Sequence, residues 1–126
     1  MHFNVKNVLQ LALHELPIHD SGITSIENEV GNKELLIHLS NLYENKKIEL
    51  LFGCVDIFKT AISGDYDQGD DVITLYHERS KEAFKKIVKD NNISYDKSLY
   101  FVLQLFSGKE YHIVCKSIDV QVIQLN

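Results

Sequence analysis

The sequence predicts an α+β fold, a mainly antiparallel sheet or small sandwich of about seven strands with two helices, at about 5–16 and 80–91. Three observations predict this class. Several segments alternate apolar and polar residues, as half-buried strands do. The turns between these segments are short, which favours antiparallel pairing. Strands do not alternate regularly with helices, as they would in a parallel α/β sheet.

The segment 5–16 is the first predicted helix. Its apolar residues recur at helical spacing and form one stripe. They are Val5, Val8, Leu9, Ala12, Leu13 and Leu16. Asn4 is a suitable N-cap, and Pro17 disfavours helical geometry at the residue before it. The sequence therefore predicts a helix that ends near residue 16.

The strands are predicted from alternation and from the turns that bound them. They cover about residues 23–30, 34–39, 48–55, 72–76, 99–106, 111–115 and 118–122. The segment 48–55 is apolar on much of both faces, which is typical of a central strand. Residues 55–63 fit either a continued strand or a short helix, and the sequence leaves this choice open.

The second predicted helix, 80–91, begins at Ser80, a good N-cap, with Glu82 in its first turn. Its apolar stripe is Phe84, Ile87 and Val88. Its lysines form a separate basic side, which predicts an amphipathic helix with a solvated face.

The composition predicts one soluble domain over residues 1–126, with 44% hydrophobic and 25% charged residues. The net charge of -5 argues against a nucleic-acid partner and against an electrostatic membrane anchor. The acidic charge is concentrated in residues 1–78, which hold 13 acidic and 5 basic groups. The chain start does not have the pattern of a secretory signal, and we expect a cytoplasmic protein.

An acidic, tyrosine-containing loop is the first candidate site. It comprises Asp65, Tyr66, Asp67, Asp70 and Asp71, with Tyr76 downstream. Carboxylates attract a basic protein and speed its association, and tyrosines supply buried contact area. The spacing does not match a calcium-binding EF-hand loop, because Gly69 and Tyr76 stand where ligands are needed. We therefore predict a protein-binding loop.

A second polar cluster supports an alternative, a metal site. His14, Glu15, His19 and Asp20 stand where the first helix gives way to a turn. Histidine with carboxylates can bind a metal or act as acid and base. The second histidine of a zinc-protease helix is absent. The lone strand residues His38, His77 and His112 are expected to be exposed or half-buried.

No motif for an enzyme or for a cofactor is present. The sequence contains no nucleophile elbow, phosphate loop or dinucleotide fingerprint. Cys54 and Cys115 both stand in apolar alternating runs, which predicts small, buried, free thiols. These observations argue against an enzyme and predict no cofactor.

Three segments carry a family resemblance. They are the turn His19-Asp20-Ser21, the strand Leu35-Leu36-Ile37-His38-Leu39 and the strand end Phe52-Gly53-Cys54-Val55. On these segments, residues 16–58 resemble a group of small uncharacterised bacterial proteins, some of which are similar to immunity proteins of polymorphic toxin systems. The resemblance implies a β-rich fold without a catalytic role. It assigns no function to His19 or Asp20.

The function expected from these features is protein binding by a small acidic bacterial protein whose partner has a basic surface. One candidate for this partner is a toxin that the protein neutralises. One alternative is a small metal-dependent hydrolase or metal-binding domain that uses His14, His19 and Asp20. Another is a homo-oligomeric structural module, because tyrosines are favoured both in strands and at interfaces. The oligomeric state is left open.

Overall fold

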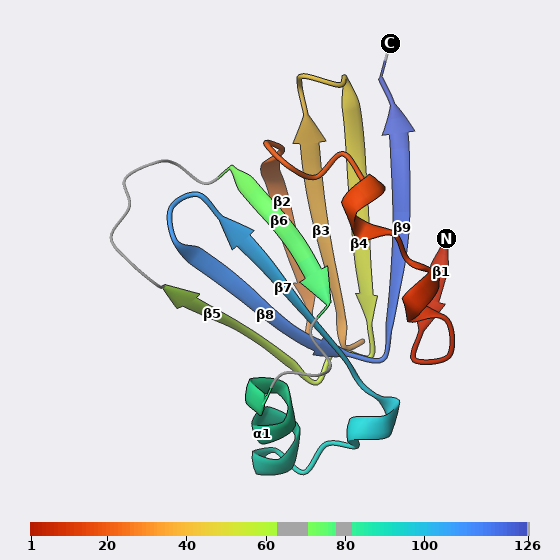
Figure 1. Ribbon diagram of the computed structural model, residues 1–126, viewed down its shortest axis with the longest axis vertical. Helices are drawn as coiled ribbons and strands as arrows, with labels where there is room; N and C mark the ends of the chain where they lie inside the picture. The colour runs from red at the N-terminus through yellow and green to blue at the C-terminus, as the bar shows by residue number, and fades with distance from the viewer. Residues whose placement is uncertain (63–70, 78–81, 126) are drawn as a thin grey trace.

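Two antiparallel sheets form the computed structural model, which describes residues 1–62, 71–77 and 82–125 (Figure 1). The first sheet has the strand order β1-β9-β4-β3-β2 and the second β5-β8-β7-β6. We call them sheet A and sheet B. The strands are β1 (His2–Asn4), β2 (Gly22–Glu29), β3 (Glu34–Asn41), β4 (Lys46–Gly53), β5 (Ile57–Ile62), β6 (Val72–His77), β7 (Leu99–Leu105), β8 (Lys109–Cys115) and β9 (Ser117–Gln124). The helical elements are α1 (Glu82–Asp90) and the short 3-10 turns η1 (Val8–Gln10), η2 (Leu13–Glu15) and η3 (Tyr95–Lys97).

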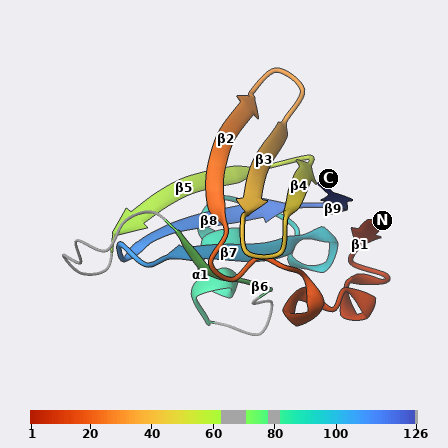
Figure 2. The ribbon, with the colours of Figure 1, turned by 90° about the horizontal axis from the view of Figure 1, so that it is seen from above.

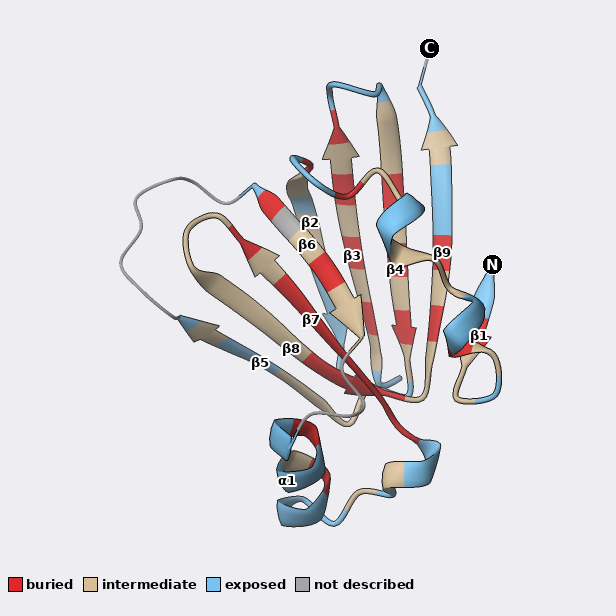
Figure 3. Cartoon of the chain, viewed as in Figure 1, coloured by how far each residue is buried: buried red, intermediate tan, exposed pale blue. Residues whose placement is uncertain are grey.

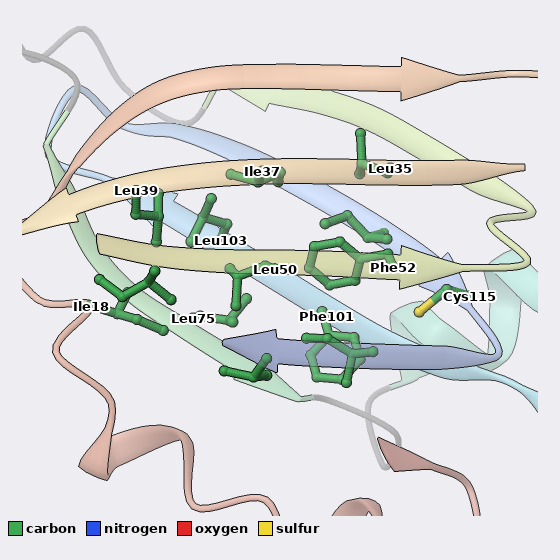
Figure 4. Close-up of a cluster of buried hydrophobic side chains, with 14 of the residues drawn as sticks. Ile18, Leu35, Ile37, Leu39, Leu50, Phe52, Leu75, Phe101, Leu103 and Cys115 are labelled. Carbon is green, nitrogen blue, oxygen red and sulfur yellow. The ribbon is translucent and has the colours of Figure 1, made fainter. Parts of the chain in front are cut away.

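The main core lies between the two sheets. Alternate residues of β3 and β4 are buried, as the banding in Figure 3 shows. Figure 4 shows side chains of both sheets meeting in this layer. The rings of Phe52 on β4 and Phe101 on β7 meet edge to face at 5.6 Å, and both side chains are fully buried. Burial of these inner faces is the main stabilising contribution that the fold makes.

The chain changes sheet twice at the same corner, between β4 and β5 and between β8 and β9. The backbone N–H of Lys116 donates to Gly53 O at 3.0 Å, which ties the two crossings together. A β-carbon at Gly53 would overlap Ser117 Oγ, so the close approach of the two crossings favours glycine there. Cys54 follows with a positive φ of 51°, and the chain then turns into β5.

The opposite corner joins β2 of sheet A to β6 of sheet B. Gly22 and Asp71 form an isolated antiparallel bridge. The N–H of Asp20 donates to Val72 O at 2.9 Å, and the N–H of Val72 donates to Ser21 O at 2.8 Å. This pairing brings the 19–22 turn against the start of β6.

The helix α1 covers part of the outer face of sheet B, and Figure 2 shows it on the side away from the β2–β3 hairpin. Phe84 is fully buried and stacks on Tyr100 at 5.3 Å between ring centroids. Val88 is buried in the same cluster. These two residues belong to the apolar stripe that the sequence predicts. No helix in the described part of the chain is long and apolar enough to cross a bilayer.

The predicted helix at 5–16 is wrong. The segment is preceded by β1 and contains the two turns η1 and η2. Asn4 does not cap a helix, because its Oδ1 accepts from Lys6 N at 2.9 Å while its own N–H donates to Asn7 Oδ1. Such side-chain bonds compete with helical ones. Phe3 pairs with Ile118 on β9, and the following chain wraps along the edge of the core, which leaves Leu9 94% exposed.

The other predicted elements agree with the fold class, but the strand count of seven is too low. The seven predicted strands correspond to β2, β3, β4, β6, β7, β8 and β9. The structure adds β1 and β5, and β5 resolves the open choice at 55–63 in favour of a strand paired with β8. The predicted helix at 80–91 is present as α1, while residues 80 and 81 lie outside the described ranges.

Candidate functional site

The outer face of sheet A brings together residues that are far apart in the sequence. The antiparallel register pairs Glu27 with Leu36, Leu36 with Leu51, and Leu51 with Asp119. Side chains that are paired across neighbouring strands point to the same face. One row across four strands therefore reads carboxylate, leucine, leucine, carboxylate. Both leucines are half-buried on this face, and the fully buried Leu35 and Leu50 point into the core.

Further carboxylates surround the two leucines. Glu29 and Glu34 form the next pair toward the tip of the β2–β3 hairpin. Glu49, on the other side, is paired with His38. We call this set the acidic face, and its members are Glu27, Glu29, Glu34, Leu36, His38, Glu49, Leu51 and Asp119. Its carboxylates create a negative potential that favours a cationic partner.

His38 lies between two of these carboxylates. Its Nε2 is 3.7 Å from Glu27 Oε2, and its Nδ1 is 3.6 Å from Glu49 Oε1. Its side chain is 16% exposed, and Nδ1 is buried without a hydrogen-bond partner. Lys47 Nζ also approaches Glu49 Oε1, at 3.6 Å. His38 thus sits half-buried on its strand, as the sequence predicts, between two carboxylates and beside the leucine pair.

Two hollows on this face share the same leucines. One, of about 300 Å³, is lined by Glu27, Glu29, Glu34, Leu36 and Leu51. The other, of about 440 Å³, is lined by Met1, Leu36, Glu49, Leu51, Asp119, Val120 and Gln121. Leu36 and Leu51 line both hollows, so the two hollows adjoin at this leucine pair. We call the row from Glu27 to Asp119, together with the hollow on either side of its leucines, the leucine trough.

A third hollow, of about 540 Å³, lies at the corner where β2 meets β6. It is lined by Asp20, Gly22, Ile23, Thr24, Ser40, Leu42, Tyr43 and Asp71. We call it the corner hollow. The corner hollow adjoins the acidic face at Ser40. Because side chains alternate along a strand, Ser40 lies on the same face of β3 as Leu36 and His38. The corner hollow thus extends the acidic face by two carboxylates.

Hydrogen bonds of Asn41 fix the turn that carries Leu42 and Tyr43. Asn41 is buried, its Oδ1 accepts from Glu44 N at 3.0 Å, and its Nδ2 donates to Pro17 O at 2.9 Å. Leu42 and Tyr43 are nevertheless 84% and 86% exposed. Because the turn is already fixed, its backbone loses little conformational freedom on binding, which favours affinity.

Of the predicted acidic loop, the structure describes only the last residue, Asp71. Asp65, Tyr66, Asp67 and Asp70 lie outside the described residues. Asp71 is exposed and lines the corner hollow. Tyr76 is half-buried further along β6, where it packs with the cluster between sheet B and α1. The structure therefore separates Tyr76 from Asp71 and places Asp71 with Asp20.

The predicted metal-binding cluster does not form a ligand set in the described part of the chain, which contains no group of three His, Cys, Asp or Glu residues able to hold a metal. His14 Nε2 is 4.0 Å from Glu15, and His19 Nε2 is 3.5 Å from Asp20. These are pairs between neighbours in sequence. Of this cluster, Asp20 lines the corner hollow.

The two cysteines differ in a way that the sequence pattern does not predict. Cys115 is fully buried as expected, and burial raises the pKa of its thiol to about 12. Cys54 is exposed, which contradicts the predicted burial. The reason is local: the positive φ of Cys54 ends the alternation of β4 at the sheet crossing. Both thiols are free.

Thiol labelling should separate these two cysteines. At pH 8, we expect a disulfide reagent to modify one thiol per folded chain, Cys54, and a second only after unfolding. Cys54→Ser should remove the fast reaction. Since an unfolded Cys115 ionises at a lower pH than the folded one, stability should also fall as the pH rises above the usual thiol pKa. Equal rates of modification of both thiols in the folded protein would contradict this picture.

Sequence reasoning missed Leu36, Leu51, Leu42 and Tyr43. The alternation that assigns Leu35, Ile37 and Leu39 to one face already implies that Leu36 points the other way. Which strands are neighbours, however, does not follow from alternation. The row that joins Glu27 to Asp119 exists only because β9 returns from sheet B to pair with β4.

Comparison with protein-family models and with curated proteins finds no match for this chain. The kind of partner that the acidic face can bind is therefore inferred from the side chains of this face.

Proposed function

We propose that this protein acts by binding another protein that has a basic surface, through the acidic face and the adjoining corner hollow. The observation that carries the proposal is the gathering of seven carboxylates beside exposed apolar side chains on one continuous surface. These carboxylates are Asp20, Glu27, Glu29, Glu34, Glu49, Asp71 and Asp119.

The two parts of this surface supply different terms of the binding free energy. Carboxylates around a rim steer a basic partner and raise the association rate. Exposed tyrosine and leucine side chains supply contact area that excludes water, and tyrosine is among the residues that most often dominate interface energetics. Leu42 and Tyr43 stand beside Asp20 and Asp71, so the corner hollow combines both kinds of contact.

We further propose that the protein works in a bacterial cytoplasm, where its partner is a toxin that it neutralises. An inhibitor of this kind needs only to occupy a basic surface of the toxin. The supports are the net charge of -5, the carboxylates of the acidic face and the resemblance of residues 16–58 to immunity-like proteins. A cationic toxin that acts on nucleic acid has the surface charge that this face complements.

The test is affinity capture from lysate of the source, read by mass spectrometry, followed by measurement of Kd with the purified partner. The variant is Asp20→Asn with Asp71→Asn. Asparagine is tolerated at Asp20, whose φ is 65°. The matched control is Asp90→Asn with Asp96→Asn, which removes the same charge from α1 and η3.

We expect the wild type and the control to bind one basic protein and the variant to bind it at least tenfold more weakly, with unchanged thermal unfolding. Suppression of that protein's toxicity on coexpression would establish the inhibitor role. A partner bound equally by all three forms, or an acidic partner, would overturn the proposal. A stoichiometric metal that is lost on Asp20→Ala would instead support the metal-binding alternative.

A further inference from the structure

We infer that the leucine trough is the docking site for a basic amphipathic helix of the partner protein, laid across the strands of sheet A over Leu36 and Leu51 and between Glu27 and Asp119. This inference rests on the proposed function and adds to it the place and the shape of the bound segment.

The dimensions of the trough fit a short helix. Neighbouring strands lie about 4.8 Å apart, so the row from β2 to β9 spans about 14 Å. A helix of about ten residues has this length. Its apolar stripe, at spacings of three and four residues, would cover Leu36 and Leu51, and one basic residue near each end would reach Glu27 and Asp119.

The hydrogen bonding of sheet A favours a helix over an extended peptide. In the trough, β3 pairs with β2 and β4, and β4 pairs with β3 and β9. The backbone N–H and C=O groups of β3 and β4 are therefore already hydrogen-bonded within the sheet. An extended segment laid over them would bury its own N–H and C=O groups without partners, which is costly. A helix satisfies these groups internally and presents only side chains.

The charges around the trough define the partner segment further. Glu29 and Glu34 lie at one side of the leucine pair, and Glu49, which Lys47 Nζ already approaches at 3.6 Å, lies at the other. Lysine and arginine stems can cover leucine while their charged ends reach such a rim. Asp119 already pairs with His2, with 3.0 Å between His2 Nδ1 and Asp119 Oδ1, and His2 is 56% exposed. A helical cation would therefore share Asp119 with His2 or displace it.

The experiment uses two fluorescent peptides as probes. One is a 14-residue helix-forming peptide with leucines at positions i, i+3, i+4 and i+7, flanked by lysines. The other has the same composition except for a central proline, which breaks the helix. Fluorescence anisotropy gives the affinity of each peptide for the wild type and for four variants. These are Leu36→Thr with Leu51→Thr, Glu27→Gln with Asp119→Asn, the corner-hollow variant Asp20→Asn with Asp71→Asn, and the matched control Glu82→Gln with Asp96→Asn.

We expect the wild type to bind the helical peptide at least tenfold more tightly than the proline peptide. The leucine variant and the charge variant should each lose at least fivefold, and the control should stay within twofold. Circular dichroism and thermal unfolding confirm that each variant is folded, and threonine is chosen because it is favoured in strands.

Equal affinities for the two peptides, no detectable binding, or losses confined to the control would overturn the inference. A loss that appears only in Asp20→Asn with Asp71→Asn would place binding at the corner hollow. That result would contradict the trough and leave the proposed function standing, because partner capture tests that function separately.

Discussion

Leu50→Ala is expected to lower the free energy of unfolding by about 2–5 kcal/mol, whereas Leu9→Ala should change it by less than about 0.5 kcal/mol. Leu50 is fully buried between the sheets, and its truncation leaves a cavity among well-packed neighbours. Leu9 is 94% exposed on η1, so its truncation removes few contacts. Denaturant unfolding, followed by circular dichroism, measures both.

Because the same substitution is made at both positions, the comparison also tests whether residues 5–16 form a helix or a chain of short turns. A helix over 5–16 would bury Leu9 on its apolar stripe, and the wrapped chain exposes it. A loss of about 2 kcal/mol or more in Leu9→Ala would contradict the description of residues 5–16. A loss below about 1 kcal/mol in Leu50→Ala would contradict the core between the sheets.

Changes of charge and truncation of a tyrosine on the proposed interface should act on different rate constants of partner binding. Glu29→Lys with Asp71→Lys should lower the association rate constant about 10- to 100-fold at low salt, because these exposed charges steer the encounter. Tyr43→Ala should instead raise the dissociation rate constant at least about tenfold, because it removes an exposed aromatic anchor. Surface plasmon resonance with the captured partner separates the two constants.

The control for this measurement is Glu82→Lys with Asp96→Lys, which makes the same change of charge on the far layer. It should lower the association rate constant less at low salt, and its effect should nearly vanish at physiological salt, where the Debye length is about 8 Å. An equal slowing in both charge variants would mean that net charge alone governs association. An unchanged dissociation rate in Tyr43→Ala would remove the corner hollow from the interface.

The fold class could be predicted from the sequence because strand alternation is a local signal. Leu35, Ile37 and Leu39 fall on one face in the sequence and are all fully buried in the structure. The predicted helix at 5–16 is wrong because apolar residues at helical spacing can also reach the core from a chain of short turns. The side-chain hydrogen bonds of Asn4 and Asn7 decide between the two. Nothing in the apolar pattern predicts them.

The candidate surface could be predicted only in fragments. Asp20 and Asp71 belong to different polar clusters in the sequence, one assigned to metal binding and the other to a partner. The bridge between Gly22 and Asp71 places both in one hollow. The leucine trough depends likewise on the pairing of β9 with β4, which joins distant parts of the chain. Long-range pairing of this kind is not determined by local alternation.

Methyl NMR of the complex tests the proposed interface most directly. The protein is labelled at leucine, isoleucine and valine methyl groups and titrated with the captured basic partner. We expect the methyl signals of Leu36, Leu42 and Leu51 to shift or broaden, and those of Ile87 and Val88 on α1 to stay in place. Saturation of the complex with Leu36, Leu42 and Leu51 unchanged, and with the shifts confined to α1, would contradict binding through the acidic face.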